Sequence, residues 1–228
     1  LHKEYRRQRQ MCIRDRITLG LNPSTDISCV QDMYKGLLSA AVRYDCRIIG
    51  GDLVRSPTTF ITVSMTGAST GKLLTRHSAL PGDLVAVTGK LGCSAGGVAA
   101  ISQGIEIGKY PYSHLVQTHH EPIPRIMEGQ ALVKAGILTA MDISDGLVDD
   151  LSKICTSSQV GAIIRSDLIP TDHQLKEAFP NDHLRLALNG GEDYELLFTG
   201  TEELITCLLY TSDAADDTPS VDLGGRRI

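Results

Sequence analysis

Three acidic segments flanked by glycine most strongly constrain the fold and function of this chain, because each begins where an apolar run ends. They are residues 48–57 (IIGGDLVRSP), 141–147 (MDISDGL) and 189–195 (NGGEDYE). Glycine lets the backbone and a neighbouring carboxylate come close to a ligand. Mg²⁺ binds oxygen ligands, usually one or two carboxylates together with water and substrate phosphates. A single Gly-Gly-Asp more often marks a turn, but the three segments together indicate a metal and nucleotide site.

Apolar periodicity between these segments alternates between strand and helix. Residues 27–44 have the spacing of an amphipathic helix, and residues 61–65 alternate as a half-buried strand does. Pro124 and Gly136 mark the start and end of another helix, and a further helix begins at Leu147. The remaining predicted strands are 17–21, 84–88, 137–143, 161–165 and 194–199. This order predicts an α/β protein in which residues 48–52 enter a turn and Asp142 ends a strand.

The order GGD-x-x-R-S-P, D-x-S-D-G-L and GGEDYEL resembles the thiamine-monophosphate kinase family, which belongs to the PurM-like superfamily of ATP-binding proteins. The likeness runs from about residue 17 to about residue 204 and also includes Arg76 and Arg125. It implies an α/β (α+β) fold with a PurM-like two-domain architecture. Residues 17–78 would be a partial N-terminal domain that binds ATP and Mg²⁺, and residues 79–206 would be most of the C-terminal domain.

The resemblance implies ATP-dependent phosphorylation of thiamine monophosphate to thiamine diphosphate by direct transfer, with no catalytic residue that forms a covalent intermediate. It also implies a cytoplasmic enzyme that is a homodimer when full length. Carried over by motif position, the Mg²⁺ ligands are Asp52, Asp142 and Asp145, the ATP contacts are Gly51, Arg76 and Ser144, and the thiamine contact is Glu192. Asp193 is expected to be structural.

Two alternatives remain open on the sequence alone. The chain could be another PurM-like ATP-dependent enzyme, such as an aminoimidazole-ribonucleotide or selenophosphate synthetase, although GGEDYEL favours the kinase. It could also be a non-catalytic fragment, because the family's N-terminal aspartate cluster and C-terminal aromatic substrate contact are expected to be missing.

The two ends of the chain differ from the rest. Residues 1–16 and 207–228 look like translated sequencing-adapter read-through, so we expect both to be non-native flanks outside the fold. The chain carries 22 basic and 27 acidic side chains, of which the flanks contribute 8 and 6. The remainder is therefore clearly acidic, which argues against nucleic acid as a partner. No apolar run approaches membrane-spanning length.

Several other features favour simple structural interpretations. Residues 67–73 do not match a P-loop, because the glycine spacing is one residue short and Leu73 replaces the Ser or Thr. The cysteines lack metal-site spacing and predict buried thiols in a reducing compartment. His119 and His120 are expected in a solvated loop. Asp149 and Asp150 are expected in the first turn of a helix, where the helix dipole favours acids.

Overall fold

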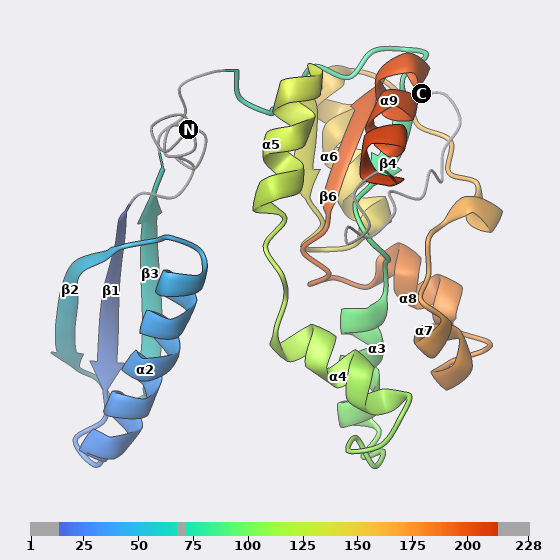
Figure 1. The fold of residues 1–228 in the computed structure, drawn as a ribbon. Helices are drawn as coiled ribbons and strands as arrows, with labels where there is room; N and C mark the ends of the chain where they lie inside the picture. Colours follow the sequence, from blue (N-terminus) through green and yellow to red (C-terminus); the bar gives the residue numbers. More distant parts are fainter. Residues whose placement is uncertain (1–13, 68–71, 214–228) are drawn as a thin grey trace. The chain divides into compact units, whose positions relative to one another are not determined.

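The computed structural model describes residues 14–67 and 72–213, with side chains described up to residue 208. The chain divides into two compact units between Lys72 and Leu73, and each is described by itself (Figure 1). This division lies slightly before the boundary predicted after residue 78. Residues 68–71, which belong to the segment that does not match a P-loop, lie outside the described residues.

In residues 14–67, the first unit is a three-stranded sheet with one helix. Its elements are β1 (Arg14–Leu21), α2 (Ile27–Arg43), β2 (Ile48–Arg55) and β3 (Phe60–Thr66). The strand order is β2-β1-β3, with β1 parallel to β2 and antiparallel to β3. The side chain of Asp26 caps α2 by accepting the N–H of Ser28 at 2.7 Å. The helix predicted over 27–44 and the strand predicted around 61–65 are both confirmed.

The Gly-Gly-Asp segment lies inside β2, so the turn predicted there is wrong. Gly51 pairs with Ile17, and Asp52 pairs with Thr18. An added Cβ at Gly51 would overlap the carbonyl oxygen of Ile17, so the close approach of β1 requires glycine at this position. Pairing with a neighbouring strand thus overrides the local turn preference of the segment.

The second unit contains an antiparallel sheet of order β4-β6-β5. Its strands are β4 (Leu84–Val87), β5 (Thr139–Asp142) and β6 (Leu196–Gly200), and every residue of β4 is buried. Helix α6 (Leu147–Ser158) packs against Val85, Val87 and Leu197. Helices α5 (Ile126–Ala135) and α9 (Glu202–Asp213) contribute to a second core with Leu84, Ala86 and Phe198. The sheet is therefore covered on both faces, which explains the continuous apolar run in β4.

A group of shorter helices completes the second unit (Figure 1). It comprises α3 (Cys93–Ser102), α4 (Tyr112–His120), η1 (Ser166–Leu168), α7 (His173–Ala178) and α8 (His183–Asn189). An added Cβ at Gly97 would collide with the backbone of Leu115. Glycine therefore lets α3 and α4 pack closely. His119 and His120 lie in the last turn of α4 and not in the predicted loop.

Two further predictions, a strand at residues 161–165 and the extent of the two flanks, differ from the structure. Residues 161–165 have no regular secondary structure, so the strand predicted there is wrong. Arg14–Arg16 belong to β1, and residues 207–213 continue α9, where Leu208 packs against the second core. These parts of the predicted flanks are therefore ordered extensions of the fold. The rest of both flanks, residues 1–13 and 214–228, lies outside the described residues. In the parts of the chain that are described, no helix has the length and apolar character needed to cross a membrane.

Candidate functional site

An open hollow of about 450 Å³ lies beside the end of β5 in the second unit. Its polar lining includes Arg76, Asp142, Ser144 and Lys153. Arg76 is held there because Thr75 pairs with the edge of β5. The Thr75 N–H donates to the carbonyl oxygen of Leu138 at 2.9 Å, and the Thr75 carbonyl accepts the Ala140 N–H at 3.1 Å. Two basic and one acidic side chain thus face a space open to solvent.

Asp150 fixes the loop between β5 and α6. Its Oδ2 accepts the backbone N–H groups of Ser144, Asp145 and Gly146 at 2.9, 3.0 and 3.2 Å, and the residue is fully buried. Burial acts to raise the pKa of Asp150, but hydrogen bonds from Lys153 and the loop outweigh it, so the pKa is lowered. An ionised Asp150 therefore holds the Asp-x-Ser-Asp-Gly loop in one shape.

Lys153 connects this loop to α6. Its ammonium contacts Asp145, and it lies 3.0 Å from Asp149 Oδ2 and 2.7 Å from Asp150 Oδ1. Hydrogen bonds to these three carboxylates raise the pKa of Lys153. Lys153 was not predicted as a site residue, although its spacing of three and four residues from Asp150 and Asp149 would place all three on one helix face.

The Gly-Gly-Glu-Asp-Tyr segment packs directly on the same loop. The N–H of Glu192 donates to the carbonyl oxygen of Ser144, and the N–H of Tyr194 donates to that of Ile143, both at 2.9 Å. Glu192 and Tyr194 have positive φ angles of 65° and 52°. An added Cβ at Gly191 would collide with the carbonyl oxygen of Ser144. The glycine is therefore required for two motifs that are distant in sequence to meet.

The side chain of Glu192 reaches α4. Its carboxylate is about half exposed, and its Oε2 lies 3.4 Å from Nδ1 of His119. The same ring nitrogen lies 2.9 Å from Oγ of the buried Ser94. A Ser-His-acid relay uses both ring nitrogens of the histidine. Since Ser94 and Glu192 share one nitrogen, this arrangement positions Glu192 and does not activate a serine.

The two acids after Glu192 anchor the segment to the fold. Asp193 accepts the N–H groups of Gly92 at 2.7 Å and Ser94 at 3.3 Å, which caps α3. Burial raises the pKa of Asp193 to about 7. Glu195 is buried and forms a two-pronged ion pair with Arg125, with N–O distances of 2.5 and 2.7 Å. Both acids therefore have structural contacts, as the sequence predicted for Asp193.

The second unit brings most of the predicted site residues together. Arg76, Asp142 and Ser144 line one hollow, while Asp145 belongs to the adjoining carboxylate cluster. Glu192 lies on the loop bonded to Ser144 but is not among the residues that line the hollow. Gly51 and Asp52 belong to the first unit. There the Oδ1 of the exposed Asp52 accepts the N–H of Leu53 at 2.8 Å.

Comparison with known proteins identifies the family. Residues 81–217 match the family described as AIR synthase related protein, C-terminal domain. The thiamine-monophosphate kinase of Escherichia coli O157:H7 is 38% identical over 190 residues. That alignment covers 82% of this chain, whereas the chain spans only 58% of the length of that relative.

Solved structures agree in fold over nearly the whole chain. The thiamine-monophosphate kinase of Stenotrophomonas maltophilia K279a superposes with a TM-score of 0.84 at 31% identity, covering 96% of this chain and 71% of that one. A structure of AaThiL complexed with AMPPCP and TMP gives a TM-score of 0.83 at 30% identity, covering 95% and 67%. The chain therefore has the PurM-like α/β fold. It belongs to the AIR synthase related protein family and, within that family, to the thiamine-monophosphate kinases.

Proposed function

We propose that this chain is part of an enzyme that transfers a phosphoryl group from ATP to thiamine monophosphate, forming thiamine diphosphate. The observation that carries the proposal is the grouping of Arg76, Asp142 and Ser144 around one open hollow. The same grouping was expected for ATP and its metal from motif positions. A relative at 30% identity is complexed with AMPPCP, an ATP analogue, and TMP.

Arg76 and Ser144 are assigned to the nucleotide phosphates. A guanidinium forms strong charge-assisted hydrogen bonds to phosphate oxygens, and the Ser144 hydroxyl can donate one more. Lys153 also lines the hollow and adds positive charge. Gly51 in the first unit is assigned to ATP by motif position alone.

Asp142, Asp145 and Asp52 are assigned to Mg²⁺, whose preferred ligands are carboxylate and water oxygens. The donor set of the second unit fits this ion. Carboxylate oxygens of Asp145, Asp149 and Asp150 lie within 4.8 Å of one another. Asp150 uses both of its oxygens in hydrogen bonds, whereas Lys153 contacts Oδ2 of Asp145 and Oδ2 of Asp149, so the Oδ1 atoms of these two residues are the more available donors. When bound, Mg²⁺ would neutralise the charge of the reacting phosphates.

Glu192 is assigned to thiamine monophosphate. Its carboxylate extends from a loop held by backbone hydrogen bonds to Ile143 and Ser144 and is accessible to solvent, so it can accept a hydrogen bond from a polar ring edge. Direct transfer requires no covalent enzyme intermediate, and these residues would act by positioning the two substrates and stabilising charge.

The complete protein is proposed to be a cytoplasmic homodimer. Ile61, Val63 and Met65 lie on one face of β3 and are all exposed. An apolar sheet face of this kind is suited to a partner subunit. Cys29, Cys46, Cys93 and Cys155 are not in disulfides, which suits a reducing compartment. No nucleic acid or membrane partner is proposed.

The proposal is tested by incubating the chain with ATP, thiamine monophosphate and Mg²⁺ and measuring thiamine diphosphate by chromatography. Asp142→Asn and Asp145→Asn should sharply reduce product, whereas Asp182→Asn at the exposed start of α8 should not. Mg²⁺-dependent ATP binding without product would support the alternative of a non-catalytic fragment. Absence of both binding and product would contradict the proposed function.

A further inference from the structure

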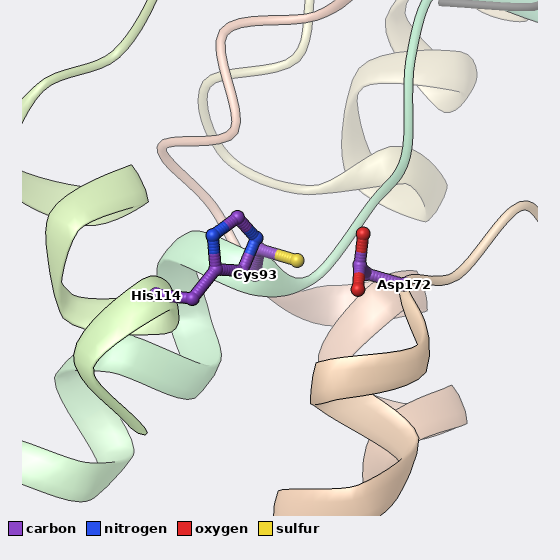
Figure 2. Close-up of side chains that lie close together, drawn as sticks. All are labelled: Cys93, His114 and Asp172. Atoms are coloured by element: carbon purple, nitrogen blue, oxygen red, sulfur yellow. The ribbon is translucent and has the colours of Figure 1, made fainter. Parts of the chain in front are cut away.

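Three side chains of different chemistry converge among the short helices of the second unit. Cys93 begins α3, His114 lies in α4, and Asp172 precedes α7 (Figure 2). One ligand atom of each, a sulfur, a ring nitrogen and a carboxylate oxygen, lies within 4.8 Å of the other two. None of the three belongs to the hollow near Arg76 or to the motifs assigned above.

These three atoms are the donor types that Zn²⁺ takes in proteins. Zinc binds cysteine sulfur at about 2.3 Å and histidine nitrogen or carboxylate oxygen at about 2.0–2.2 Å. Ligand atoms on one tetrahedral zinc ion are therefore roughly 3–4 Å apart. The ligand atoms of the present cluster lie within 4.8 Å of one another, close to that spacing. Mg²⁺ does not suit this site, because a thiolate and an imidazole are softer ligands than the oxygens it prefers.

The carboxylate of Asp172 is already oriented and charged. Oδ1 of Asp172 accepts the N–H of Gln174 at 2.9 Å, and Oδ2 lies 3.3 Å from the ammonium of Lys90. Burial acts to raise the pKa of Asp172, but these two contacts lower it overall. Asp172 is therefore an ionised ligand whose direction is fixed by a neighbouring hydrogen bond, as is common around metal centres.

The surroundings of Cys93 disfavour a thiolate without a nearby cation. The residue is only 4% exposed. Burial, together with the charges of Asp172, Asp193 and Glu195, raises the pKa of the Cys93 thiol to about 12. A catalytic cysteine needs the opposite shift, so Cys93 is not an activated nucleophile. The charge of the neighbouring Asp172 attracts a divalent cation, which would stabilise the thiolate once the thiol proton has left to solvent.

We propose that Cys93, His114 and Asp172 bind one Zn²⁺ ion through the sulfur, a ring nitrogen and a carboxylate oxygen, with water in the fourth position. The ion would join α3, α4 and α7 and stabilise their packing around Leu115 and Leu175. The sequence analysis did not foresee this site, because its ligands are far apart along the chain and no two follow a metal-binding spacing. The proposal is independent of the proposed kinase activity.

The test is a Zn²⁺ titration of the chelator-treated chain, with bound metal measured by elemental analysis and stability by thermal unfolding. We expect about one zinc ion per chain and a higher melting temperature with zinc. Replacing zinc with Co²⁺ should add a near-ultraviolet absorption band from thiolate-to-metal charge transfer. Cys93→Ser should abolish this band.

Ligand variants separate the proposed site from adventitious binding. Asp172→Asn keeps a residue that can cap α7 but removes the charge, and His114→Gln changes a half-buried position. Each should weaken zinc binding by more than about tenfold, whereas the controls Cys155→Ser and His120→Gln should not. If the His114 and Asp172 variants bind zinc as tightly as the parent chain, or if the parent binds none, the proposal is wrong.

Discussion

The backbone N–H of Glu192 donates a 2.9 Å hydrogen bond to the carbonyl oxygen of Ser144. This bond joins two loops that are far apart in sequence, one proposed to bind nucleotide and metal and the other to bind thiamine monophosphate. Gly191 permits the contact because a side chain there would collide with Ser144. The relative placement of the two proposed substrate contacts is therefore set by the backbone.

Asp150 should be more important for stability than its neighbour Asp149. Asp150→Asn weakens three backbone hydrogen bonds and the contact with Lys153. We expect the free energy of unfolding to fall by about 1.5–3 kcal/mol, the range for hydrogen bonds to a charged group. The exposed Asp149→Asn should change it by less than about 0.5 kcal/mol. Urea denaturation measures both values, and equal losses would show that Asp150 does not organise the loop.

Asp193 should make stability depend on pH. Its folded-state pKa of about 7 lies above the ordinary value of 3.8, mainly because the group is buried. A raised pKa means that the folded state binds the proton more tightly than the unfolded chain. The resulting stabilisation is complete below the unfolded-state pKa and is lost as pH rises through the folded-state pKa.

The measurement compares thermal unfolding of the parent chain and Asp193→Asn from pH 4 to pH 8. Asparagine keeps one acceptor oxygen, which can replace the shorter hydrogen bond from Gly92, and it does not titrate. The stability of the parent relative to the variant should therefore decrease across this range. A difference that stays constant with pH would contradict the raised pKa.

Substitutions of Glu192 and Arg76 should affect the Michaelis constants of different substrates. Glu192→Gln should raise the Michaelis constant for thiamine monophosphate and change that for ATP little, because only one substrate loses a hydrogen-bond partner. Arg76→Ala should do the reverse. Steady-state kinetics on a complete enzyme that carries these residues would test this separation. Equal losses for both substrates, together with a lower melting temperature, would mean that Glu192 only braces its loop.

Much of the fold could be predicted because apolar spacing is a local signal. The helix starting at Ile27 and the buried strand β4 follow from such spacing, and the glycine at position 136 predicts the end of α5. Gly51 and Asp52 were misplaced in a turn because strand pairing with β1 is a tertiary contact. Asp142 and Ser144, which were chosen by motif position, line one hollow, and their roles in binding metal and ATP stay predictions.

Residues whose roles depend on tertiary contacts were harder to predict. Lys153 belongs to no motif. It is important because it contacts three carboxylates that meet only in the folded chain. His119 was expected in a solvated loop, but it reaches Glu192 from the end of α4. Cys93 and Asp172 likewise meet through the packing of α3 and α7.

The most direct test of the account is calorimetric titration of the chain with a non-hydrolysable ATP analogue, with and without Mg²⁺. The parent chain should bind the analogue more tightly in the presence of Mg²⁺. Asp142→Asn should weaken this Mg²⁺-dependent binding by about tenfold or more, equivalent to about 1.4 kcal/mol, while Asp182→Asn should leave it unchanged. Binding that does not depend on Mg²⁺, or that is equal in the parent and Asp142→Asn, would contradict a metal-nucleotide site at the end of β5.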